Sequence, residues 1–97
     1  MRIIAKRTLR EFWEKYADAE TPLKVWYKNI SEAEWKNNNE LKRQFKNVSI
    51  VGNDRLVFNI KGNTYRLVVA VDYEKQIVWI KFIGYHKDYN KINVKTI

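Results

Sequence analysis

A single histidine stands among phenols near the end of the chain. The segment reads Gly84-Tyr85-His86-Lys87-Asp88-Tyr89-Asn90, and His86 is the only histidine in 97 residues. An imidazole exchanges its proton near neutral pH, so one histidine is sufficient for acid–base chemistry. Tyr85 and Tyr89 bring two phenols within one helical turn of it. The residues thus predict a proton-transfer site, with an inert exposed loop histidine as the equally weighted alternative.

Basic residues recur in three segments that are rich in Val, Ile, Phe, Tyr and Trp. Such segments, separated by short turn signals, predict strands over residues 55–60, 64–72 and 76–83. We take Gly62–Asn63 and Glu74–Lys75 as the centres of two tight turns. Two successive hairpins of this kind form an antiparallel β-meander.

The pairing that these turns impose determines which side chains share a face of the sheet. The first turn places Asn59 opposite Arg66, and the second places Lys81 opposite Val68. One face is apolar and contains Leu56, Phe58, Ile60, Tyr65, Leu67, Val69, Ile80 and Phe82. The other face collects Arg55, Asn59, Arg66, Trp79 and Lys81.

The polar face has the composition of a phosphate-binding surface. Guanidinium and ammonium groups held on strands form charge-assisted hydrogen bonds with phosphate oxygens, and Trp79 offers a platform for an unpaired base. In this register Ile83 pairs with Arg66, so His86, three residues further on, lies beside the same face. The alternative is ordinary polar alternation on a solvent-facing sheet.

Amphipathic helices precede the sheet. Apolar residues at helical spacing predict a helix over residues 6–17, after a short opening strand over residues 2–4. Thr21 followed by Pro22 predicts the start of a second helix, with Thr21 as its N-cap. This helix carries the apolar stripe Leu23, Trp26, Tyr27 and Ile30.

Two weaker signals follow the second helix. Ser31 and Glu34 have the spacing of a capping box, and Asn39 could cap a short third helix through Phe45. Helices first and hairpins second predict an α+β fold, with the N-terminal helices packed on one face of a curved antiparallel sheet. We expect residues 1–97 to form a single domain.

Composition excludes several classes of protein. The absence of cysteine removes disulfide scaffolds, zinc ribbons and thiol catalysis, and one histidine cannot form a multi-histidine metal site. We therefore expect no metal and no cofactor. No apolar run has the length of a signal peptide or a membrane span, which predicts a cytoplasmic protein without a membrane partner. The net charge of +8 favours a polyanionic partner.

Two long segments resemble the HigB-type toxins of bacterial type II toxin–antitoxin systems, which have a RelE-like fold. They are the run from Asp54 to Val69 and the run from Ile80 to Ile92, with its Gly-x-His-x-x-Tyr signature. The order of elements before them is also similar, so the likeness covers nearly the whole chain. Tyr85 departs from the family pattern, which often has a small hydroxyl residue before the histidine.

The resemblance implies an mRNA interferase, an endoribonuclease that cleaves mRNA and in many members acts on the ribosome. It also implies a helix-turn-helix antitoxin, HigA-like, that holds the toxin inactive. The residues to which the family pattern points are Arg55, Arg66, Lys81, His86 and Tyr89. We predict Arg66, Lys81, His86 and Tyr89 as catalytic residues, and Arg55, Asn59, Trp79 and Lys87 as RNA-binding residues.

The chemistry that this implies needs little machinery, because the RNA supplies its own 2′-hydroxyl nucleophile. We expect Arg66 and Lys81 to stabilise the charged phosphorane, Arg55 to position the RNA backbone, and His86 with Tyr89 to transfer protons. The products would be a 2′,3′-cyclic phosphate and a 5′-hydroxyl. Two other functions fit the same basic face: a non-catalytic RNA-binding module, and an interaction domain that docks an acidic protein.

Overall fold

Five strands form one mixed sheet in the order β1-β5-β4-β3-β2, in a computed structural model that describes residues 1–97. The strands are β1 (Arg2–Ile4), β2 (Ser49–Val51), β3 (Arg55–Ile60), β4 (Tyr65–Asp72) and β5 (Ile77–Tyr85). Strands β3, β4 and β5 are the predicted antiparallel meander. The sequence did not predict β2, nor the parallel pairing of β1 with β5 that makes the sheet mixed.

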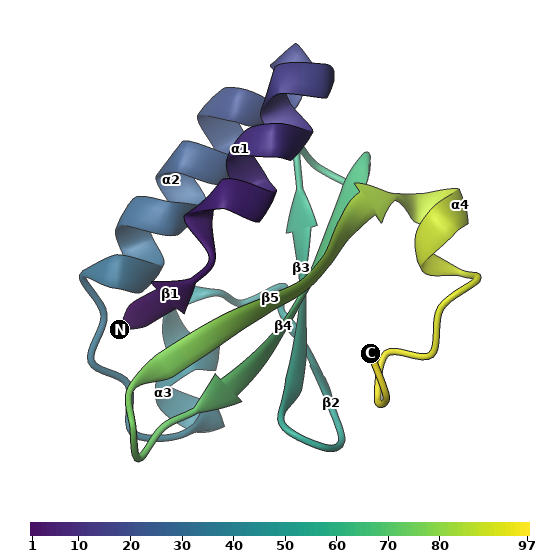
Figure 1. The fold of residues 1–97 in the computed structure, drawn as a ribbon. Coiled ribbons are helices and arrows are strands. Elements are labelled where there is room, and N and C mark those ends of the chain that lie inside the picture. The colour runs from purple at the N-terminus through teal and green to yellow at the C-terminus, as the bar shows by residue number, and fades with distance from the viewer.

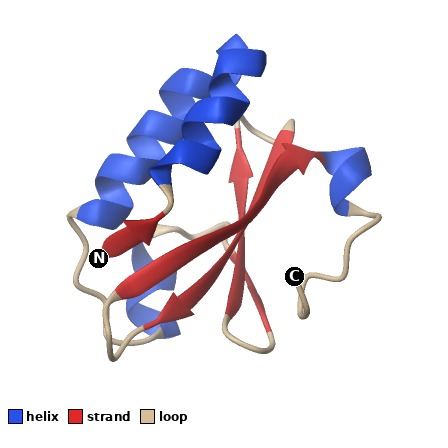
Figure 2. Ribbon diagram, in the orientation of Figure 1, coloured by secondary structure: helices blue, strands red, loops and turns tan.

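The helices divide unequally between the two faces of the sheet (Figures 1 and 2). They are α1 (Lys6–Lys15), the 3₁₀ turn η1 (Ala17–Ala19), α2 (Glu20–Ser31), α3 (Asn38–Gln44) and α4 (His86–Tyr89). In Figure 1, α1 and α2 lie side by side on one side of the sheet, and α4 with the C-terminal segment lies on the other. No helix is long and apolar enough to cross a membrane.

The core lies between the sheet and the two N-terminal helices, as the spacing of the apolar residues predicts. Leu9 and Trp13 of α1 and Leu23 of α2 meet the predicted apolar face of the sheet in one cluster of 18 buried residues. Leu67, at the centre of that face, has no exposed surface. The α+β architecture with helices on one face is therefore confirmed.

The helix boundaries differ from the predicted ones by about one turn at most. Helix α1 ends at Lys15 because Tyr16 leaves the helical conformation, with φ −123° and ψ 88°. Helix α2 begins at Glu20 with Ala19 at its N-cap, so the prediction of Thr21 as the cap was wrong. Pro22 lies in the first turn of α2, where its missing N–H breaks no hydrogen bond.

The two later helix signals were also misread. Helix α2 ends at Ser31, whose hydroxyl donates to the carbonyl of Lys28 at 3.0 Å, so no capping box forms with Glu34. Helix α3 is capped by Asn37, whose Oδ1 accepts from the N–H of Glu40 at 3.0 Å. Three consecutive asparagines made the cap ambiguous, since each of them has a suitable side chain.

Candidate active site

The first hairpin has the predicted register. Asn59 pairs with Arg66, Val57 with Val68 and Arg55 with Ala70 across β3 and β4. The turn is a four-residue loop over 61–64 closed by a hydrogen bond from Thr64 N–H to the Lys61 carbonyl, with Gly62 and Asn63 at its centre. Asn59 and Arg66 are therefore neighbours on the face turned away from α1 and α2, which we call the open face.

The second hairpin follows the prediction only as far as Val69 and Ile80. A β-bulge between Val68 and Val69 then shifts the pairing by one residue, so Val68 faces Phe82 and Arg66 faces Gly84. The predicted pairings of Val68 with Lys81 and of Arg66 with Ile83 were wrong. A bulge inserts one extra residue on one strand and increases the local twist, and Lys81 is that residue here.

The bulge changes which side chains lie on the open face. Counting from Trp79, which is opposite Ala70, alternation places Lys81 on the open face, where it is exposed. Phe82, which we expected in the core, lies on the open face because it pairs with Val68. The predicted members Arg55, Asn59, Arg66, Trp79 and Lys81 thus share one face, and a phenyl ring joins them.

The proton-transfer candidates come together at one rim of this face. His86 is the first residue of α4, exposed, and only two residues after Gly84, the partner of Arg66. Its Nδ1 lies 3.3 Å from the side-chain nitrogen of Asn90, and its ring centroid lies 6.4 Å from that of Tyr89. The end of β4 that carries Arg66 therefore pairs with the end of β5 that leads into α4, while the Arg66 guanidinium donates to the Asn63 carbonyl of the turn at 3.4 Å. Lys87 is exposed on the same short helix.

Tyr85 does not belong to this group. It pairs with Tyr65 on the core side of the sheet, and its ring centroid lies 5.1 Å from those of both Tyr65 and Tyr16. Although Tyr85 directly precedes His86 in the chain, its ring packs with Tyr16 and Tyr65 on the core side while His86 is exposed. The larger ring at this position fills space beneath the helices.

Asp18 forms hydrogen bonds beside the cluster of Tyr16, Tyr65 and Tyr85. The carboxylate of Asp18 accepts from the Tyr65 hydroxyl and from Lys61 Nζ, each at 2.5 Å. The hydrogen bonds from Lys61 and then Tyr65 lower the pKa of Asp18. Burial, followed by the hydrogen bond with Asp18, raises the pKa of the Tyr65 phenol. The neutral phenol and the ionised carboxylate together hold the 3₁₀ turn η1 against the end of the β3–β4 hairpin, where Tyr65 pairs with Tyr85, the residue before α4.

Arg55 lies at the other end of the open face. It is four positions from Asn59 along β3, roughly 13 Å in an extended strand. Its guanidinium donates to the carbonyl of Asn53 at 3.1 Å and to that of Ile97 at 2.6 Å, while its Nε is buried without a partner. Asn53 also binds the carbonyl of Lys95 at 2.7 Å. The C-terminal segment therefore occupies the guanidinium that we expected to contact RNA.

Trp79 and Arg55 both line a hollow on the open face. A cavity of about 370 Å³ is lined by Trp79, Arg55 and Tyr73, with Asp54 and Asp72 at its rim. Burial, and then the charge of Asp54, raises the pKa of Tyr73 to about 12. The Trp79 side chain is half-buried.

The sequence analysis missed two residues at the rim near His86. Asn90 contacts the imidazole, and Phe82 lies beside Arg66 on the open face. The signal for Phe82 was Gly84, because a glycine inside a strand often marks a bulge or a close approach. Nothing in the sequence pattern distinguishes Asn90 from the other asparagines.

The α+β architecture, with N-terminal helices on one face of an open sheet and basic side chains on the other, is consistent with the class of RelE-like toxins. The chain belongs to the HigB toxin family, described as the RelE-like toxic component of a toxin–antitoxin system, whose sequence profile matches residues 19–92. The chain is 29% identical over 92 residues to the mRNA interferase toxin HigB of Escherichia coli K12, covering 93% of this chain and 88% of that protein. The mRNA interferase HigB of Shigella flexneri matches to the same extent.

Proposed function

We propose that this protein is an mRNA interferase, an endoribonuclease that arrests translation by cleaving mRNA without a metal ion. The observation that carries the proposal is that Arg66 pairs with Gly84, only two residues before the exposed His86, on the face that collects Arg55, Asn59, Trp79 and Lys81. Membership of a toxin family whose relatives are named mRNA interferases supports it.

The reaction we propose is attack of a ribose 2′-hydroxyl on the adjacent phosphate. Arg66 and Lys81 stabilise the charge that develops on the phosphorane oxygens, and each such donor contributes about 3–4 kcal/mol in comparable sites. His86 and Tyr89 remove the proton from the nucleophile and return one to the leaving 5′-oxygen. Acid–base catalysis of this kind accelerates the reaction by about 10²–10⁴-fold. The 2′-hydroxyl proton leaves, the P–O5′ bond breaks, and a 2′,3′-cyclic phosphate and a 5′-hydroxyl result.

The remaining predicted residues bind the RNA on both sides of the scissile bond. Asn59 beside Arg66 and Lys87 on α4 are exposed and can contact the sugar–phosphate backbone. Trp79, further along the face, stacks on an unpaired base. Arg55 contacts a phosphate only if that phosphate takes the place of the Ile97 carbonyl.

The setting that we propose is the translating ribosome in the cytoplasm, with a HigA-like helix-turn-helix antitoxin as the inhibitor. The net charge of +8 favours association with ribosomal RNA as well as with mRNA. We infer the antitoxin from the family description, which names a toxic component of a two-part system.

The test is induction of the wild-type gene in a bacterial host beside Arg66→Ala and His86→Ala, with primer extension across an abundant mRNA. Lys28→Ala, an exposed lysine on α2, is the matched control. We expect growth arrest and new 5′ ends with wild type and with the control, and neither with the two site variants. RNA binding without cleavage by wild type would identify a binding module, and no RNA preference would identify an interaction domain.

A further inference from the structure

Strand β3 has an edge that the rest of the sheet leaves uncovered. Strand β2 pairs with β3 over only three residues, Arg55 to Val57, and the chain before Ser49 turns away toward α3. The second half of β3, from Phe58 to Ile60, therefore pairs on one side only. An uncovered strand edge is a template for another strand.

The unpaired groups on this edge belong to Asn59. Val71 N–H donates to the Asp54 carbonyl, and in an antiparallel pair the hydrogen-bonded positions alternate, so residues 56, 58 and 60 bond to β4. The N–H and C=O groups of residues 55, 57 and 59 point the other way. Strand β2 covers the first two positions, and the main-chain groups of Asn59 have no partner within the chain.

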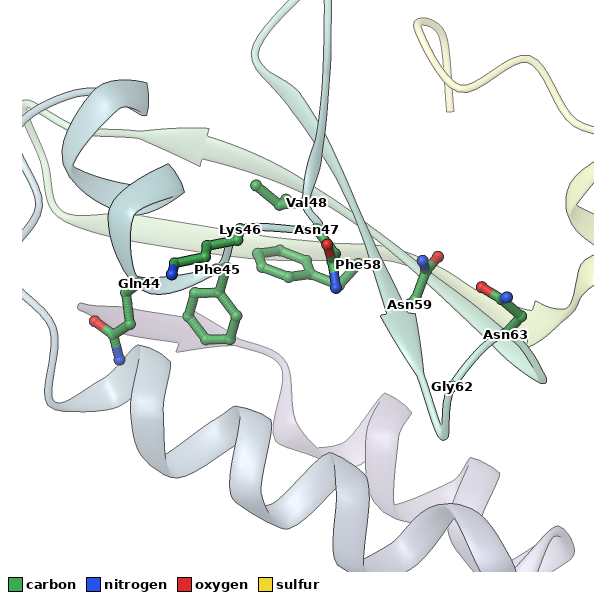
Figure 3. A pocket seen from close by; sticks show the side chains of 9 residues that line it. All are labelled: Gln44, Phe45, Lys46, Asn47, Val48, Phe58, Asn59, Gly62 and Asn63. Atoms are coloured by element: carbon green, nitrogen blue, oxygen red, sulfur yellow. The ribbon is translucent and has the colours of Figure 1, made fainter.

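Two adjoining hollows form a groove along this edge of β3. One hollow of about 520 Å³ lies between residues 44–48 and the end of β3, and Figure 3 shows Phe45, Phe58 and Asn59 along it. A second hollow of about 350 Å³, between α2 and β3, shares these three residues. The groove therefore continues the line of β2 past the point where β2 ends.

Apolar and polar groups on the α2 side of the groove lack partners. Val25 lines the groove and is 54% exposed, one of only two large apolar residues in the chain with so much exposed surface. Trp26 also lines it and is 3% exposed, yet its indole N–H has no acceptor. These features are typical of a surface that a partner completes.

The charge around the groove selects the partner. Its lining contains no acidic residue, and of its two lysines Lys61 is paired with Asp18 while Lys46 has no acidic partner. Lys42 and Arg43 of α3 lie with Lys46 around the adjoining hollow, so the entrance is also basic. An occupant with carboxylates on one side and apolar side chains on the other matches this surface.

We propose that the antitoxin inserts an extended, acidic segment into this groove as a strand beside β3. The main chain of the segment pairs with Asn59, its apolar side chains pack on Val25 and Phe45, and its carboxylates face Lys46. This inference rests on the proposed function only in taking the partner to be the antitoxin. The groove lies on the β3 edge and α2, so the segment holds the toxin without contacting His86.

The test uses the product of the open reading frame adjoining the toxin gene as the binding probe, with full-length toxin. We expect Val25→Glu and Lys46→Glu to weaken the complex by about tenfold or more. The matched controls Ile50→Glu, at the other strongly exposed apolar residue, and Lys75→Glu, in the β4–β5 turn, should change binding by less than about twofold. Hydrogen exchange of the Asn59 amide should slow in the complex.

Cleavage of mRNA by Val25→Glu in the absence of the partner separates this proposal from the proposed function. We expect that cleavage to match wild type. Wild-type binding by both groove variants with an unprotected Asn59 amide would overturn the inference and leave the nuclease assignment intact. Loss of RNA binding by Lys46→Glu with unaltered antitoxin binding would identify the groove as an RNA surface and overturn it as well.

Discussion

The ring of Phe82 lies against the α-carbon of Gly84, so that a Cβ atom at position 84 would be 2.7 Å from the ring Cζ. This is closer than real Cβ contacts come, so any side chain at position 84 displaces the ring. Since Gly84 faces Arg66 across the hairpin, the missing side chain at position 84 leaves room for the Phe82 ring on the open face next to Arg66.

Gly84→Ala should therefore reduce both stability and cleavage. Overpacking of this kind costs about 1–3 kcal/mol, and the displaced ring would move toward Arg66. Urea denaturation and in vitro cleavage measure the two effects. In the Phe82→Ala background, Gly84→Ala should lower the free energy of unfolding by a smaller amount. Equal losses in both backgrounds would show that the two residues do not interact.

Replacement of His86 or Tyr89 should impair the chemical step and leave RNA affinity largely intact. We expect His86→Ala and Tyr89→Phe each to lower the single-turnover rate by about 10²–10⁴-fold. Tyr85→Phe is the control, since its ring packs on Tyr16 and Tyr65 on the other side of the sheet. Full activity in both site variants would show that groups other than His86 and Tyr89 transfer the protons.

Asp18 should make the stability of the fold depend on pH in the acidic range. Its folded-state pKa is lowered below 3.8 by Lys61 and Tyr65, so its contribution is present above that pH and disappears as the pH falls through the folded-state value. Asp18→Asn should lower the melting temperature at pH 7 and have progressively less effect below about pH 4.

The control for this experiment is Glu32→Gln, which removes an exposed carboxylate just after α2. The melting temperature of Glu32→Gln should differ little from that of wild type at every pH. Because the Asp18 side chain is 46% exposed, added salt should also weaken the effect at pH 7. If the melting temperatures of wild type and Asp18→Asn differed by the same amount from pH 7 to pH 3, the Asp18 carboxylate would not be the source of the pH dependence.

Lys81 and Lys87 should contribute to the salt dependence of RNA binding. Each phosphate contact to single-stranded RNA adds about 0.7 to the slope of log affinity against log salt concentration. Lys81→Ala and Lys87→Ala should each reduce the slope by about that amount in titrations of a non-cleavable 2′-deoxy RNA. Lys75→Ala, in the distant β4–β5 turn, should leave it unchanged.

The sequence predicted the residues of the open face better than their arrangement. Arg55, Asn59, Arg66 and Trp79 lie where turn positions and alternation placed them, because the first hairpin has a regular register. The bulge at Lys81 was not predictable in this way, since a bulge depends on the twist of the whole sheet and not on a local motif. It moved Phe82 to the open face and brought His86 one residue nearer to the partner of Arg66.

The helices, the three-stranded meander and the residue types of the open face follow from local sequence patterns. Apolar spacing of 3.6 in the first part of the chain and alternation in the second dictate helices packed on a sheet, because each pattern buries its apolar side chains in only one way. The residues of the Gly-x-His-x-x-Tyr segment and the net charge of +8 are the sequence features from which we predict acid–base chemistry on RNA.

The tertiary structure alone decided which of these groups meet. Contacts such as Arg55 with Ile97 and Tyr65 with Asp18 join residues that lie far apart in the chain and carry no pairing signal in the sequence. They arise because the C-terminal segment, the 3₁₀ turn before α2 and the bulged strand are placed by packing over the whole sheet. The exposed edge at Asn59 has the same origin, since only the length of β2 relative to β3 leaves its main chain without a partner.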